Sequence, residues 1–149
     1  MTVDNNKIKC VIYNIVKYPI IFIVGAIVYM TIEILYRGYT HWTMGVLGGI
    51  SLILIGLIDE VTSKDLPLLV QAPLASIIIT LLEYYAGCIL NLKLGLDIWD
   101  YSELPFNIDG QVCLYFSLAW MVLGMVAVVI DNLIRHYFFD EPWKEIRLI

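Results

Sequence analysis

The chain has 149 residues, of which 60% are hydrophobic and only 15% are charged. Soluble domains average about 45–50% apolar and about 25% charged residues, so this composition excludes an ordinary soluble domain and indicates a single membrane domain. The net charge of −5 excludes a nucleic-acid-binding protein, because phosphate binding needs a basic surface. We therefore expect the lipid bilayer, and no nucleic acid, among the partners of the chain.

Four apolar segments follow one another along the chain, separated by polar connections. A helix needs about 20 apolar residues to cross a bilayer core about 30 Å thick, so the pattern predicts an all-α integral membrane bundle of four transmembrane helices. The second segment is short, and a re-entrant or broken segment is the alternative for it. We expect one membrane domain, 1–149, with spans at about 18–36, 43–58, 66–90 and 111–137.

Glycines recur in the second apolar segment, at Gly45, Gly48, Gly49 and Gly56. Small residues allow membrane helices to approach each other closely. A bundle of four helices leaves little room for a pore within one chain. We therefore expect a homo-oligomer, formed through this glycine face.

Lysine and arginine residues are distributed unevenly between the two predicted sides of the membrane. One side holds only Arg37 and Lys93, whereas the side with both termini and the 59–65 connection holds all the others. Cytoplasmic loops carry an excess of basic residues, so we expect a multi-pass protein of the cell membrane with both termini in the cytoplasm. The basic residues on that side are Lys7, Lys9, Lys17, Lys64, Arg135, Lys144 and Arg147.

The longest polar interruption is residues 91–110, which mixes carboxylates with aromatic residues. Its length and its aromatic content argue against a disordered connection, so we expect a structured outer loop of about 20 residues between helices 3 and 4. Aromatic rings and carboxylates together suit a cation, which makes Trp99, Asp100, Tyr101 and Asn107 candidate binding residues. The alternative is that these residues only cap turns and fold the loop.

Two carboxylates, Glu33 and Glu83, lie inside apolar segments, where a carboxylate costs roughly 2.5–3.5 kcal/mol. Arg37 follows Glu33 by four residues on the same helical face, which predicts an ion pair. Glu83 has no basic residue within a turn or two. We expect Glu83 either to meet Arg37, if the first and third segments are neighbours, or to line a wet cavity. A buried, hydrogen-bonded role is the alternative.

Asp131 precedes Arg135 by four residues in the fourth segment, which predicts a second ion pair. The three cysteines, Cys10, Cys88 and Cys113, follow no metal-binding or redox spacing, and ordinary apolar packing is expected, with a Cys88–Cys113 bridge as an open alternative. The chain contains no phosphate loop, dinucleotide fingerprint or hydrolase motif. We therefore expect no enzyme, no catalytic residue, no metal and no cofactor.

A set of motifs stands out along the chain: residues 33–38 (Glu-Ile-Leu-Tyr-Arg-Gly), 40–44, 48–49, 99–107, 110–114 and 117–120, with Gln71 and Glu83. With these motifs the chain resembles the type IV family of ABC-transporter permeases, which are small bacterial integral membrane proteins. The resemblance covers about residues 20–140 and implies a membrane fold and a role in transport. Because the chain carries no ATP-binding motif, energised transport would need a partner chain.

Together these observations predict a small transporter, permease or solute-binding membrane component. It would act on a small solute or ion through an outward-facing polar site between the helices. The alternative is a membrane scaffold that does not transport and that docks a protein partner. The candidate substrate-binding residues are Glu33, Arg37, Glu83, Trp99, Asp100, Tyr101 and Asn107.

Overall fold

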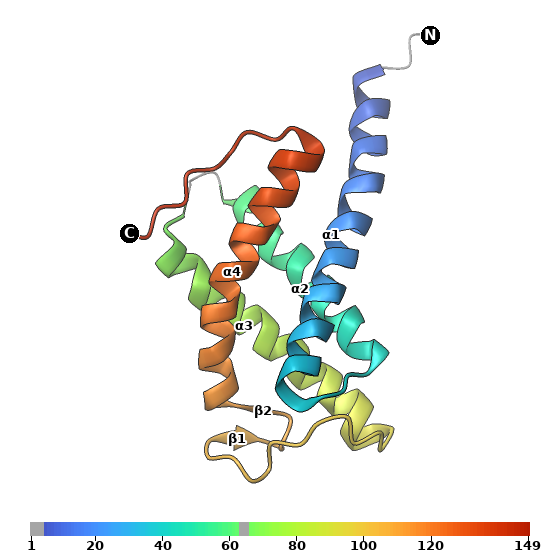
Figure 1. The fold of residues 1–149 in the computed structure, drawn as a ribbon, viewed down its shortest axis with the longest axis vertical. Coiled ribbons are helices and arrows are strands. Elements are labelled where there is room, and N and C mark those ends of the chain that lie inside the picture. Colours follow the sequence, from blue (N-terminus) through green and yellow to red (C-terminus); the bar gives the residue numbers. More distant parts are fainter. Residues whose placement is uncertain (1–4, 63–65) are drawn as a thin grey trace.

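Within the described residues, four α-helices form one bundle in which successive helices run in opposite directions (Figure 1). The structure is a computed structural model that describes residues 5–62 and 66–149, and of residues 5–12, 14 and 59 it describes the backbone alone. The start of α1 and the end of α4 lie at the same end of the bundle. The helices are α1 (Asn5–Arg37), α2 (Trp42–Val61), α3 (Leu68–Gly87) and α4 (Leu114–Phe139).

Three of the described helices contain stretches that are long and apolar enough to cross a membrane, at Ile15–Arg37, Leu68–Lys93 and Leu114–Phe139. The second of these stretches, Leu68–Lys93, includes η1 (Cys88–Lys93), a π-helical segment that continues α3. The apolar part of α2, Trp42–Ile58, is shorter. The all-α prediction is therefore confirmed, and three of the four predicted spans have the length and composition needed to cross a membrane. Because α2 is one continuous helix of 20 residues, the broken-segment alternative is wrong.

Glycines bring the backbones of α1 and α2 into close contact. A Cβ atom added at Gly25 would lie 2.6 Å from the carbonyl oxygen of Gly48, and one added at Gly49 would lie 2.5 Å from the ring of Phe22. At the far end of α2, Gly56 faces Asp131 of α4. The glycine face of α2 is thus filled by helices of the same chain, and the expectation that it forms an oligomer contact is wrong.

Helices α3 and α4 form the second close pair. A Cβ atom added at Gly124 would lie 2.7 Å from the Cβ of Ala75, and the hydroxyl of Ser76 donates to the carbonyl oxygen of Ser117 at 2.5 Å. Where no water is present, such a hydroxyl group finds its hydrogen-bond acceptor on a neighbouring helix. The bundle therefore consists of two tight pairs, α1 with α2 and α3 with α4.

The connection between α3 and α4 is a folded cap. Strands β1 (Asn107–Ile108) and β2 (Val112–Cys113) pair antiparallel, so α4 begins at Leu114 and not at residue 111 as predicted. The side chain of Asn91 accepts from the Ile98 amide at 2.8 Å and donates to the carbonyl oxygen of Trp99 at 2.9 Å. These buried bonds replace the backbone partners that an irregular loop lacks.

The C-terminal segment returns along the bundle to the start of α3. The amides of Leu68 and Leu69, which have no partner within the helix, donate to the carbonyl oxygens of Arg147 and Leu148 at 2.7 and 3.3 Å. This contact ties the chain end to the third helix.

The two cysteines whose side chains are described, Cys88 and Cys113, are both free, so the alternative of a disulfide between them is wrong. The side chains of Cys10, Lys7 and Lys9, and all of Lys64, lie outside the described residues. Among the side chains that are described, no group of three or more His, Cys, Asp or Glu is placed to hold a metal ion.

Candidate functional site: a carboxylate between three helices beside an aromatic cavity

Glu83 of α3 lies in the centre of the site and is only 2% exposed. The hydroxyl of Tyr29 on α1 donates to Glu83 Oε1 at 2.8 Å, and the indole Nε1 of Trp120 on α4 donates to Oε2 at 2.6 Å. The two rings stack on each other with centroids 5.3 Å apart. One buried carboxylate therefore joins three helices through uncharged donors. This is the buried, hydrogen-bonded arrangement that the sequence left as the alternative.

Arg37 pairs with Glu33 and does not bond to Glu83. Its Nη2 lies 2.7 Å from Glu33 Oε1, which confirms the predicted ion pair, and its Nη1 donates to the carbonyl oxygen of Ile98 at 2.7 Å. The hydroxyl of Thr40 donates to the second oxygen of Glu33 at 2.6 Å. The expectation that Arg37 meets Glu83 is wrong. Arg37 instead connects the end of α1 to the cap.

A cavity of about 250 Å³ lies beside Glu83, between the last turns of α1, the first turns of α4 and the cap. Its only charged lining residue is Glu33, whose charge is matched by that of Arg37. Tyr101 of the cap stacks on Phe116 at 4.5 Å between centroids, and burial raises the pKa of Tyr101, so its hydroxyl stays protonated. The lining includes six aromatic rings, those of Tyr29, Tyr36, Tyr101, Tyr115, Phe116 and Trp120.

The other predicted cap residues fold the loop and do not line this cavity. The carboxylate of Asp100 accepts from the amide and the hydroxyl of Ser102 at 2.8 and 2.9 Å. Asn107 donates to the carbonyl oxygen of Leu104 at 2.7 Å and accepts from the Gly110 amide. Trp99 is buried, and its Nε1 donates to a backbone oxygen within the cap. These contacts are those of the loop-folding alternative.

The sequence reasoning missed the aromatic residues that hold Glu83. Tyr29 precedes Glu33 by four residues, so its position on the same helical face was available as a signal. Trp120 carried no such signal, because only the packing of α4 against α3 brings it to Glu83.

A second cluster of charges joins the helices at the opposite end of the bundle. Lys17 of α1 lies 2.9 Å from Glu60 of α2 and 3.2 Å from Glu141, and Arg135 of α4 also pairs with Glu60. Arg135 Nε lies 2.5 Å from Asp131 Oδ2, which confirms the predicted pair. Partial burial opposes ionisation of Glu60, but hydrogen bonds from Arg135 and Lys17 outweigh it and lower the pKa of Glu60 to about 2.

Comparison with models of known protein families gives one match, which covers residues 6–148 and carries the description "Putative ABC-transporter type IV". No curated protein matches the chain. No solved structure matches it either.

Proposed function

Because the chain belongs to the type IV ABC-transporter family, we propose that it is a membrane component of a transport system that binds an apolar monocation in the aromatic cavity beside Glu83. The single observation that carries this proposal is the pairing of Glu83 with two uncharged donors that themselves line the cavity. An ionised Glu83 would then leave one negative charge without a matching cation. The surrounding aromatic faces add their own attraction for a positive charge.

The chemistry of the cavity selects among solutes. An anion would meet aromatic faces and the Glu33 carboxylate, and a strongly hydrated metal ion would need several oxygen ligands that the lining does not supply. A weakly hydrated organic cation loses little on leaving water and gains from the rings. The cavity of about 250 Å³ exceeds a 150 Å³ engineered apolar cavity that binds benzene, so it has room for a small aromatic ammonium ion.

We further propose that the cavity and the cap face outward and that both termini are cytoplasmic. The excess of basic residues at the end with the termini supports this orientation. In intact cells, a membrane-impermeant thiol reagent should label a Ser102→Cys protein and should not label an Arg147→Cys protein. The reverse pattern would place the cap in the cytoplasm.

The decisive experiment measures binding of benzyltrimethylammonium to the purified protein by calorimetry, with neopentylbenzene as the neutral probe of the same shape. We expect the cation to bind at least about tenfold more tightly than the neutral probe, which corresponds to about 1.4 kcal/mol. Glu83→Gln should remove most of this difference. Equal binding of the two probes by the wild-type protein would refute the proposal.

A surface variant provides a second test of the cavity in case Glu83→Gln does not fold. Tyr36 lines the cavity and is largely exposed, so Tyr36→Leu removes one aromatic face without opening the core. Its affinity for the cation should fall about three- to tenfold. Tyr85, which is also largely exposed but lies outside the cavity, gives the matched control Tyr85→Leu, which should bind as the wild type does.

One observation favours the alternative of a partner-docking subunit. Phe106, at the base of the β1–β2 hairpin, is 78% exposed and has a φ of +55°, which is uncommon for a residue with a side chain. If the cap docks a protein, a stoichiometric partner should be lost on purification of Phe106→Ala. The same partner should be retained by Leu94→Ala, which changes an exposed cap residue outside the hairpin.

A further inference from the structure

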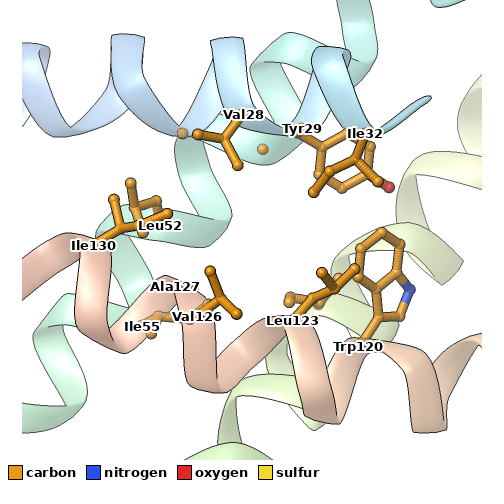
Figure 2. A pocket seen from close by; sticks show the side chains of 13 residues that line it. Val28, Tyr29, Ile32, Leu52, Ile55, Trp120, Leu123, Val126, Ala127 and Ile130 are labelled. Atoms are coloured by element: carbon orange, nitrogen blue, oxygen red, sulfur yellow. The ribbon is translucent and has the colours of Figure 1, made fainter. Parts of the chain in front are cut away.

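A second, smaller cavity adjoins the aromatic one and lies deeper between the helices. It has a volume of about 70 Å³ and is lined by apolar side chains of α1, α2, α3 and α4. Figure 2 shows α1 and α4 on its two sides, with Val28 and Ile32 facing Leu123 and Ala127 across it. The two cavities share four lining residues, Tyr29, Ile32, Trp120 and Leu123, so they adjoin each other along α1 and α4, and together they are called the groove here.

The size of the narrow part limits what can occupy it. A cavity of about 150 Å³ accommodates a benzene ring, and a helix has a diameter of about 10 Å, so about 70 Å³ encloses neither. A single hydrocarbon chain is thin enough to lie along it in part, with its other side uncovered at the half-exposed Val126. None of the lining residues is charged, so a polar solute would lose its hydrogen bonds there without replacement.

The packing of the helices explains why this groove stays open. The close contact of Gly25 with Gly48 fixes α1 against α2, and the contact of Gly124 with Ala75 fixes α4 against α3. Neither contact draws α1 toward α4. The space between them is also lined by Leu52 of α2, and at its edge Val126 of α4 is 49% exposed.

We propose that the groove binds a single-chain amphiphile with a cationic ammonium head group, the head in the aromatic cavity near Glu83 and the chain in the narrow cavity between α1 and α4. This inference rests on the proposed function for the head group and adds the chemical class of the ligand. The lining residues of the two cavities indicate where the head group and the chain of the ligand lie. Charge and aromatic rings lie next to the cap, and aliphatic residues such as Leu52 and Ile130 lie deeper.

The test compares alkyltrimethylammonium ions with chains of four, six and eight carbons, all below their aggregation concentrations. Each added methylene should tighten binding to the wild-type protein about twofold, which is half of the gain in log affinity for a fully buried methylene. Val126 lines the narrow cavity and is 49% exposed, so Val126→Trp can fill the groove without disturbing the core. In this variant the gain with chain length should vanish, while benzyltrimethylammonium should bind within about twofold of wild type.

Val122→Trp is the matched control, because Val122 lies one turn earlier on α4, is 59% exposed and does not line the groove. It should keep the full dependence on chain length. The same dependence in Val126→Trp as in wild type would overturn the inference. A change of oligomeric state in Val126→Trp without a change in chain-length dependence would also overturn it and would assign the groove to a second copy of the chain.

The head-group site and the chain site can fail separately. If benzyltrimethylammonium binds but chain length has no effect, the proposed function stands and this inference is wrong. If no cation binds, the proposed function is wrong, and a series of n-alkanols then measures the hydrocarbon site alone by the same contrast of Val126→Trp with Val122→Trp. Equal alkanol binding by these two variants would leave no role for the narrow cavity.

Discussion

Helices α1 and α4 are bridged at two places, and each bridge is a carboxylate from another helix. Near the cap the bridge is Glu83 of α3, which accepts hydrogen bonds from a phenol and an indole. At the opposite end it is Glu60 of α2, which is held by Lys17 and Arg135. The carboxylate that joins the helices is thus held by neutral donors at one end and by cations at the other.

The difference in donors distinguishes the candidate binding site at Glu83 from the structural contact at Glu60. Glu60 already has two cations beside it, Lys17 and Arg135, whereas Glu83 has none among its hydrogen-bond partners. Hydrogen bonds from neutral donors satisfy the oxygen atoms of Glu83 but would not cancel the charge of its ionised form. Binding of a cation is therefore expected at the Glu83 end alone, and stability should depend most on the Glu60 end.

The largest effect is expected from Arg135→Met, which takes the positive charge away from three carboxylates at a side chain that is only 5% exposed. Loss of one partner of a buried ion pair costs about 3–5 kcal/mol. Denaturant unfolding of the purified protein in detergent measures this loss. The control is Arg147→Met, whose ion pair with Glu145 is exposed and should cost less than about 1 kcal/mol. Equal losses in the two variants would contradict a structural role for Arg135.

Gly56→Ala should have the next largest effect on stability. Its Cβ would lie 2.5 Å from Asp131 Oδ1 and 2.7 Å from Arg135 Nη2, so the buried pair must move. Overpacking of this kind costs about 1–3 kcal/mol. In Gly45→Ala the new Cβ meets the flexible side chain of Met30 first, and the loss of unfolding free energy should be smaller. A larger loss in Gly45→Ala would show that Gly56 does not shape the charged end.

Acid should weaken the Glu60 end selectively. The pKa values of Glu60 and Glu141 are lowered in the folded protein, so the unfolded chain binds more protons and the free energy of unfolding falls as the pH drops from about 4.5 to about 2. Because Glu60 is partly exposed, we expect a loss of about 1 kcal/mol from it. Melting temperatures across this pH range should fall less steeply in Glu60→Gln than in the exposed control Glu145→Gln. Parallel curves would exclude Glu60 as a source of the acid sensitivity.

Asp100→Ala should have the smallest effect, and it tests whether the folding of the cap and binding in the cavity are independent. It removes hydrogen bonds to Ser102 in an exposed turn, which should cost about 1 kcal/mol of unfolding free energy. The affinity for benzyltrimethylammonium should stay within about twofold of wild type. A tenfold loss of affinity would return Asp100 to the binding site that the sequence predicted.

The features that the sequence predicted correctly depend on local spacing. The pairs Glu33–Arg37 and Asp131–Arg135 are four residues apart, and the helices follow from continuous apolar runs. The cap was recognised from its length and aromatic content, but its strands moved the start of α4 to Leu114.

The bridges at the two ends required tertiary structure. Tyr29 and Glu83 are 54 residues apart, and Glu60 and Arg135 are 75 residues apart. Which residues meet over such distances is decided by how α1 and α4 sit around α2 and α3. The spacing of charges along the sequence carries no information about that arrangement, so it predicted the local Glu33–Arg37 pair but left the partners of Glu83 open.

The groove between α1 and α4 has a mechanical consequence. Because close contacts at glycines hold α1 against α2 and α4 against α3, the groove could widen only if the two helix pairs moved apart as units. Among the bonds that cross this division are those of Tyr29 with Glu83 and of Arg135 with Glu60. Entry of a larger solute would therefore require bonds of this kind to open.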